Sequence, residues 1–331
     1  MYYNENVWYG AYGGCFISDA FTLSCDKYYE EFQKAATSEK FRKNYEEIKD
    51  KYAETSVTFK EETDGEVLCY AGENYGALLG TATLAKWRGK KAVFGARYAD
   101  EALLCAEVCA DLKVPVKIFL SKEIGAVRSL TDQLSLLEVE IDTKTCDTLF
   151  NLPEMYAFQN WISDADNMHL ITSRSNVGAF PQTNIAAAFC ADYRKNVLKD
   201  VEEKYGKITR VVVPVVSGTD ALALMYNDVD KKYVGVECDT EPDLGTELDS
   251  YCGSFTKVRR NRYADRVLAA ELVNLEEEGK ISLVQIRPEE AIRSEHGLSL
   301  QSKAAAAYAE KNPAEGKTLV LVHPFRVGGA V

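Results

Sequence analysis

Short apolar runs alternate with helical stretches along this chain, and this alternation constrains its fold more than any other feature. The runs are typical of buried strands, because they continue for several residues and end at polar or glycine-containing turns. Such runs lie at residues 90–96, 116–121, 168–173, 209–220, 232–238 and 317–324. Helices are expected at residues 22–54, 75–88, 100–115, 125–141 (ending in a strand), 146–166, 182–206, 221–229, 268–279 and 298–312.

This order indicates an α/β fold with a mostly parallel sheet that helices cover on both faces. Ligands of such sheets bind at the carboxyl ends of the strands. We therefore expect the functional site at the turns that follow the strands, namely Gly95–Ala99, Ser173–Pro181, Ser217–Asp220 and His323–Gly328.

Composition narrows the classes of function. The 331 residues carry a formal net charge of −12, which disfavours nucleic acid and anionic membranes as partners. No apolar run is long enough to cross a bilayer and no secretory signal is visible. Nine cysteines without a CxxC pair fit a reduced, cytoplasmic protein. Cys105 and Cys109 are expected to be buried thiols, and no cluster has the spacing of a metal site.

Six segments carry a resemblance that covers most of the chain. They are YGGCFISDAFTLSC at 12–25, GALLGTATLAKWRGKK at 76–91, SNVGAFPQT at 175–183, VVVPVVSGTDALALMY at 211–226, RSEHGLSLQSKAAAAYA at 293–309 and GKTLVLVHPFRVGG at 316–329. In this order they resemble the β subunit of tryptophan synthase, a fold-type II enzyme that uses pyridoxal phosphate (PLP). The resemblance implies two mostly parallel, three-layer α/β subdomains at 56–185 and 186–331. It also implies that a helical segment at 1–55 packs on the C-terminal half.

The chain departs from the family at the residues that hold the cofactor. Aligned on GKK without gaps, Asn74 stands where the family has its PLP lysine, and Glu73 replaces a histidine. An amide cannot form an imine with PLP. The family's phosphate loop becomes Ser217, Gly218, Thr219 and Asp220, and the residue facing the pyridine nitrogen falls near Phe325. These changes predict a degenerate site without PLP.

Several residues keep two interpretations. Asn74 is either a ligand-binding amide or a drifted helix N-cap. Glu73 and Asp220 form an acid/base pair or a cation site, or Asp220 only complements a helix dipole. His296 matches a family histidine and is either a catalyst or a packed side chain. The candidate catalytic residues are Glu73, Asp220 and His296, and the predicted ligand pocket contains Glu73, Asn74, Arg97, Arg174, Ser217, Thr219, Asp220 and Arg293.

Three functions follow from these observations. The first is a pseudoenzyme that binds a small polar metabolite or a partner subunit, either a paralogue or an α-like chain. The second is a PLP-independent enzyme that reuses the old pocket, and the third is a PLP-dependent lyase with an unrecognised lysine. Whether the chain is an enzyme stays open at this point. The resemblance also implies a homodimer.

Overall fold

The computed structural model describes most of the chain. The described residues are 8–9, 12–13, 19–52, 57–61, 67–146, 152–173, 182–215, 218–228, 230–238, 272, 275–291 and 298–323. They form two compact units. Unit 1 contains residues 1–13, 54–74 and 190–325, and unit 2 contains residues 14–53, 75–189 and 326–331. Within the described residues, no helix is both long and apolar enough to span a bilayer.

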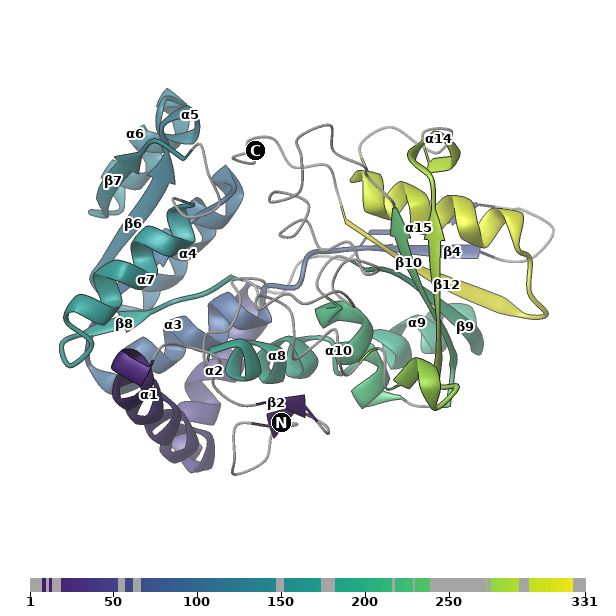
Figure 1. Ribbon diagram of the computed structural model, residues 1–331, viewed down its shortest axis with the longest axis horizontal. Helices are drawn as coiled ribbons and strands as arrows, with labels where there is room; N and C mark the ends of the chain where they lie inside the picture. The colour runs from purple at the N-terminus through teal and green to yellow at the C-terminus, as the bar shows by residue number, and fades with distance from the viewer. Residues whose placement is uncertain are drawn as a thin grey trace. The chain divides into compact units, whose positions relative to one another are not determined.

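Unit 1 is built on a six-stranded sheet with the order β11-β10-β9-β12-β4-β3 (Figure 1). All neighbours pair in parallel except β3 and β4, which are antiparallel. The strands are β3 (Val57–Glu61), β4 (Val67–Ala71), β9 (Ile208–Pro214), β10 (Lys232–Cys238), β11 (Ile281–Ile286) and β12 (Lys317–Val322). A separate antiparallel pair joins β1 (Trp8–Tyr9) and β2 (Tyr12–Gly13).

Helices cover both faces of this sheet. Val212, Val234 and Val320 share a buried cluster with Ala304 of α15 (Leu300–Lys311) and Ala291 of α14 (Pro288–Ala291). Alternate residues of a strand point to opposite faces. Tyr233, the neighbour of Val234, accordingly donates from its hydroxyl to the carbonyl of Leu224 in α10 (Thr219–Asn227). The sheet is therefore the middle of three layers. The unit also contains α9 (Val197–Tyr205), and α8 (Gln182–Tyr193) crosses the division between the units.

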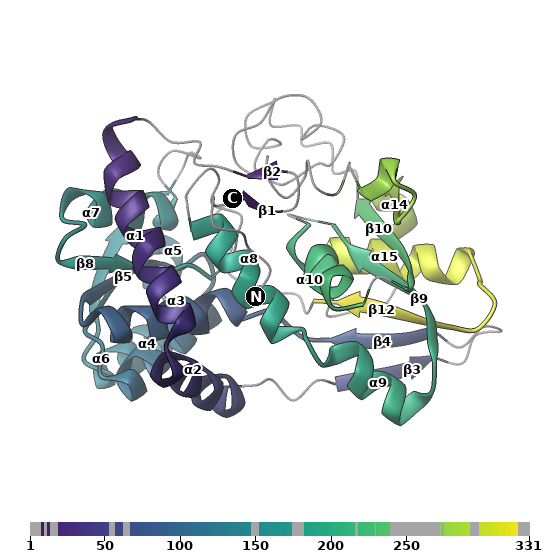
Figure 2. The same cartoon turned by 90° about the horizontal axis from the view of Figure 1, so that it is seen from below.

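Unit 2 has a four-stranded parallel sheet with the order β7-β6-β5-β8 (Figure 2). Its strands are β5 (Lys91–Gly95), β6 (Val116–Ser121), β7 (Glu140–Lys144) and β8 (Met168–Leu170). Its helices are α1 (Asp19–Thr37), α2 (Glu39–Lys51), α3 (Gly76–Arg88), α4 (Ala99–Leu112), α5 (Lys122–Gly125), α6 (Arg128–Leu136) and α7 (Pro153–Ser163). Helix α3 contacts α1, α2 and α4 as well as β5 and β8, which explains why its residues from Gly76 to Ala85 are all buried.

The prediction of a mostly parallel, layered α/β fold is confirmed, and most expected elements lie where the apolar pattern placed them. Two expected helices are each broken in two. Ser38 separates α1 from α2 because its side chain accepts a hydrogen bond from the Phe41 amide and so starts a new helix. The turn at residues 194–196 separates α8 from α9. Five of the described strands were missed, namely β1, β2, β3, β4 and β11.

The division into units differs from the predicted boundaries at 55 and 185. Helices α1 and α2 contact α3 and group with residues 75–189, rather than with the C-terminal half. Residues 54–74 group with the C-terminal half, because β4 pairs with β12 from Val67↔Thr318 to Ala71↔Val322. Strand pairing of residues distant in sequence thus determines which segments belong together.

Candidate functional site

Polar side chains gather at the carboxyl ends of three adjacent strands of unit 1. Strand β4 is followed by Gly72, Glu73 and Asn74, strand β9 by the turn that leads to Asp220 in α10, and strand β12 by His323. The strands are neighbours in the order β9-β12-β4, and all three run in parallel. Their ends therefore meet at one edge of the sheet, where parallel sheets bind ligands.

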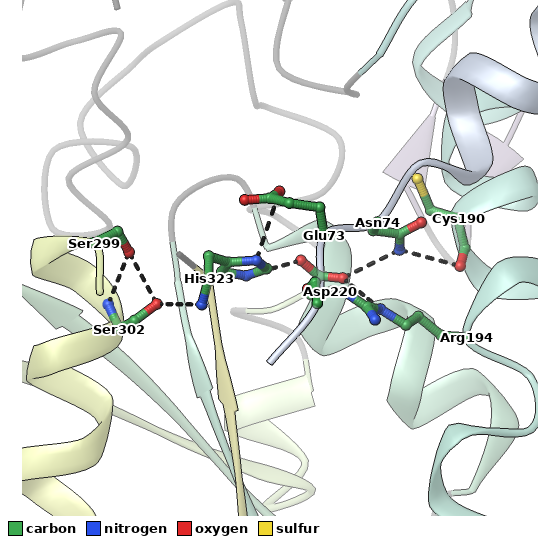
Figure 3. A network of polar contacts seen from close by, with 9 residues as sticks. Glu73, Asn74, Cys190, Arg194, Asp220, Ser299, Ser302 and His323 are labelled. Atoms are coloured by element: carbon green, nitrogen blue, oxygen red, sulfur yellow. Dashed lines mark hydrogen bonds and ion pairs between the residues drawn. The ribbon is translucent and has the colours of Figure 1, made fainter. Parts of the chain in front are cut away.

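Asp220 is the centre of this group (Figure 3). Its Oδ1 accepts hydrogen bonds from Asn74 Nδ2 at 3.1 Å and from Arg194 Nε at 3.3 Å. Its Oδ2 lies 3.3 Å from Nε2 of His323. We call these four residues the Asp220 network. Burial by itself raises the pKa of Asp220, but the Arg194 charge and the contacts with His323 and Asn74 bring that pKa well below its usual range. Asp220 is therefore a carboxylate at neutral pH.

Arg194 supplies the permanent positive charge of the network. Its side chain is only 1% exposed, and one guanidinium nitrogen donates to the carbonyl of Gly72 at 2.8 Å. The guanidinium also lies over the rings of Tyr70 and Tyr193, at 5.6 Å and 5.9 Å from their centroids. Burial by itself lowers the pKa of Arg194, but Asp220 and the two tyrosines raise it by more than burial lowers it. The net pKa is raised, so this side chain stays charged. The break between α8 and α9 places Arg194 in a turn.

Asn74 directly precedes the N-cap residue of the helix that follows it. Tyr75 is the N-cap residue of α3, and its side chain makes no capping hydrogen bond. The amide of Asn74 donates to the carbonyl of Cys190 at 3.2 Å as well as to Asp220. Asn74 therefore joins the loop after β4 to α8 and α10. The N-cap position thus belongs to Tyr75 rather than to Asn74, and the ligand-binding interpretation stays a prediction.

The backbone of His323 is held by the start of α15. The His323 amide donates to Ser302 Oγ at 2.7 Å, and the His323 carbonyl accepts from the Ser299 amide at 3.0 Å. Ser299 is the N-cap residue of α15, and its hydroxyl donates to Ser302 Oγ at 2.9 Å. These contacts fix the position of the imidazole between two carboxylates.

The second ring nitrogen of His323 is directed at Glu73. Nδ1 of His323 lies 3.7 Å from Oε2 of Glu73, which is within ion-pair distance but too long for a hydrogen bond. Among the described residues, this buried nitrogen has no hydrogen-bond partner. The side chains of His323 and Glu73 are 16% and 11% exposed, so both retain some contact with solvent.

The structure brings together three of the predicted pocket residues, and another belongs to the second unit. Glu73, Asn74 and Asp220 meet at the edge described above. Arg97 lies in unit 2, where its Nε donates to Glu154 at 2.8 Å. Thr219 begins α10, but its side chain lies outside the described residues. Also outside them are Arg174, Ser217, Arg293, His296 and Phe325.

The sequence analysis included His323 only as the first residue of an expected site turn, and it missed Arg194 altogether. His323 directly follows the apolar run 317–322, and its place at the end of a parallel strand is the signal that put this turn in the expected site. Arg194 was expected inside a continuous helix, and its local sequence carries no comparable signal. The buried positions of Cys105 and Cys109 are confirmed. No group of three or more metal-binding side chains occurs in the described part of the chain.

The fold is similar to that of solved structures. One match is maize serine racemase, with a TM-score of 0.55 and 11% sequence identity over 87% of this chain and 93% of that chain. At this identity the likeness shows the fold alone. No protein-family profile matches the chain. The fold is that of the fold-type II PLP enzymes. The narrower expectation of a tryptophan synthase β subunit stays a prediction.

This fold implies PLP as a cofactor, but the residues at this edge do not fit it. Asn74 has an amide where an imine requires an amine. Gly218 is the N-cap residue of α10 with φ +83°, and a Cβ at that position would lie 2.4 Å from Leu272 Cδ1. Leu272 therefore leaves no room for a side chain at this position. The ionised carboxylate of Asp220 would also repel a phosphate dianion there.

Proposed function

We propose that this chain is a pseudoenzyme of the fold-type II class, which binds a small polar metabolite or a partner subunit and does not carry out PLP chemistry. One observation carries the proposal. At the ends of β4, β9 and β12, the side chains of Asn74, Asp220 and Arg194 are engaged with one another. A site that holds PLP would instead offer a lysine amine and free donors for a phosphate.

Electrostatics supports the absence of PLP. A phosphate placed about 4 Å from the Asp220 carboxylate would meet a repulsion of roughly 1–4 kcal/mol per unit charge at effective dielectrics of about 80 to 20. The burial of the network favours the stronger end of that range. The side chains of Glu73, His323 and Asp220 all remain partly exposed, so a small polar metabolite would meet these three side chains.

The absorbance spectrum of the purified protein tests this proposal. We expect no band near ~410–430 nm with or without added PLP, because the imine that absorbs there needs a lysine. Borohydride reduction followed by peptide mass mapping provides the control. Scattered, substoichiometric pyridoxyl-lysines would reflect surface chemistry, whereas one stoichiometric label at a single lysine would support the PLP-dependent lyase instead.

The kind of ligand is tested separately. Light scattering measures the subunit composition, for which we propose a homodimer.

Thermal melting of the protein in the presence of each member of a panel of amino acids and small organic acids tests metabolite binding. We expect a binding metabolite to raise the melting temperature of the wild-type protein, and to do so less for Glu73→Gln. If no metabolite acts and a second chain co-purifies stoichiometrically, the partner-subunit form of the proposal is favoured.

A second candidate is a PLP-independent enzyme, and the position of His323 favours it. An imidazole held by Asp220 on one nitrogen, with the other nitrogen facing Glu73, is an arrangement that moves protons. The matching reaction class is proton transfer to or from a small polar metabolite. Such a proton transfer would exchange a substrate C–H hydrogen for deuterium in D₂O, and NMR would detect the loss of that C–H signal. The exchange should disappear in His323→Gln, and its absence in the wild-type protein with all metabolites of the panel would favour the pseudoenzyme.

A further inference from the structure

Three separate parts of the chain direct polar groups at the Asp220 carboxylate. Arg194 comes from the turn between α8 and α9, Asn74 from the loop after β4, and His323 from the end of β12. Their donor atoms lie 3.1–3.3 Å from the two carboxylate oxygens. A guanidinium, an amide and an imidazole that converge in this way are the usual protein groups that bind an oxyanion.

Arg194 requires such an anion. Its side chain is 99% removed from solvent, and a buried guanidinium without a nearby negative charge is strongly destabilising. The protein supplies the anion from its own chain, through a residue that α10 carries into the space between the three donors. Arg194 also lines a surface hollow of mixed charge, whose other polar side chains are Lys195, Lys199, Glu202, Glu203, Asn227 and Asp228.

We infer that Asp220 is an internal ligand of an oxyanion-binding site formed by Arg194, Asn74 and His323, and that loss of its carboxylate opens the site to an external oxyanion. The inference goes beyond the proposed function, because it concerns what the site binds and holds whether or not a reaction is catalysed. It assigns to the wild-type protein a site for carboxylates and phosphates that is blocked from within.

Two variants at position 220 separate the effect of the carboxylate's charge from the effect of its volume, and a third variant is the control. Asp220→Ala removes the carboxylate and leaves space for formate, which has the same size as the missing group. Asp220→Asn removes the charge but keeps the volume, so it leaves no space for an added anion. Glu154→Ala is the matched control, because it breaks an Arg–carboxylate pair in unit 2, where Arg97 and Glu154 are 18% and 15% exposed.

The experiment measures the melting temperature of each protein in formate, phosphate or chloride at equal ionic strength. At about 100 mM formate or phosphate, we expect Asp220→Ala to gain about 4 °C or more over its value in chloride. Wild type, Asp220→Asn and Glu154→Ala should gain much less. Rescue by formate alone would indicate a site of carboxylate size, and rescue by phosphate as well would show that the larger oxyanion also fits.

The inference is overturned if neither anion stabilises Asp220→Ala more than it stabilises Glu154→Ala. Should Asp220→Ala be recovered only in unfolded form, refolding from urea decides the question. A higher yield of folded protein in formate or phosphate than in chloride supports the site, and equal yields refute it. The absorbance test with PLP is independent of this result, so the pseudoenzyme proposal and the oxyanion site can fail separately.

Discussion

At the scale of single residues, the Asp220 network shows how a charge is kept inside a protein. The carboxylate, whose side chain is 17% exposed, gives up most of its contact with water but gains a guanidinium, an amide and an imidazole. Each donor comes from a different strand end or turn, so the network also joins the segments that carry it. Removing one partner leaves the remaining charge buried and uncompensated, which costs more than the intact pair contributes.

Arg194→Met tests this interpretation. We expect it to lower the free energy of unfolding by about 3–5 kcal/mol, because Asp220 is left buried without its counter-charge. The double variant Arg194→Met/Asp220→Asn should lose clearly less than the sum of the two single losses, since neither charge is then present. Urea denaturation measures all four proteins. Additive losses would show that Arg194 and Asp220 do not stabilise each other.

At the scale of elements, the junction between β12 and α15 positions His323. The side chain of Ser302 is fully buried and accepts a hydrogen bond from the His323 amide. The Ser299 amide donates a hydrogen bond to the His323 carbonyl. The strand end is thus held by the first turn of a helix. This arrangement keeps the imidazole at the edge of the sheet whatever the function of the site.

Ser302→Ala should therefore destabilise the protein by about 1–3 kcal/mol, because the His323 amide loses its acceptor. We also expect the NMR signals of the His323 ring to shift. Asn312→Ala, a change at the exposed C-terminal end of the same helix, serves as the control and should leave those signals in place. Unchanged His323 signals in Ser302→Ala would contradict the positioning role.

The contact between β5 and α7 depends on a glycine. A Cβ at Gly95 would lie 2.3 Å from the backbone carbonyl of Pro153, so no side chain fits between the strand end and the helix start. Gly95→Ala should cost about 1–3 kcal/mol in the free energy of unfolding, as overpacking does elsewhere. Gly125→Ala is the comparison, because its added methyl would meet only the side chain of Thr143. A cost for Gly95→Ala no greater than that for Gly125→Ala would contradict the tight contact.

At the scale of the whole molecule, the two units bury different titratable groups. Unit 1 holds the Asp220 network, whereas unit 2 buries His169 between Tyr28 and Arg88. The hydroxyl of Tyr28 lies 2.9 Å from Nε2 of His169, and an Arg88 nitrogen lies 2.8 Å from Nδ1. Burial, and then the positive charge of Arg88, lower the pKa of His169 well below its ordinary value of 6.5.

This difference predicts how stability depends on pH. The unfolded chain takes up a proton at His169 near pH 6.5, whereas the folded protein does so only at a lower pH. The contribution of His169 to the free energy of unfolding is therefore fully present above about pH 6.5. It falls as the pH is lowered, by up to about 1.4 kcal/mol per pH unit. His169→Gln should show a shallower fall between about pH 6.5 and 5, as measured by urea denaturation.

Hydrogen exchange locates the effect. At mildly acidic pH we expect amides near His169 in α1, α3 and β8 of unit 2 to lose protection before those of β9, β10 and β12 in unit 1. The pKa of Asp220 is also lowered, but its contribution is lost only below its ordinary value of 3.8. Earlier loss of protection in unit 1 would contradict the assignment.

Much of the fold could be predicted because hydrophobic periodicity is a local signal. Strands β6 and β10 lie exactly at the residues of the apolar runs 116–121 and 232–238, and α3 begins one residue after its predicted start. Strand β4 was missed, although Glu73 and Asn74 of the site follow it directly. The structure identifies this strand through its pairing with β12, which lies far from it in the sequence.

The sequence by itself determined most of the succession of strands and helices, and it has an amide at position 74, which the family resemblance aligns with a PLP lysine. Both follow from residue types and short-range spacing. Only the tertiary structure decided that Asn74 meets Asp220, 146 residues away, and that Arg194 reaches Gly72, 122 residues away. Those contacts depend on the order of β9, β12 and β4 in the sheet and on a turn within a predicted helix. Strand order and buried charge pairing are properties of the packed chain. They arise between segments that are distant in sequence, and the local sequence of one segment does not indicate its partner.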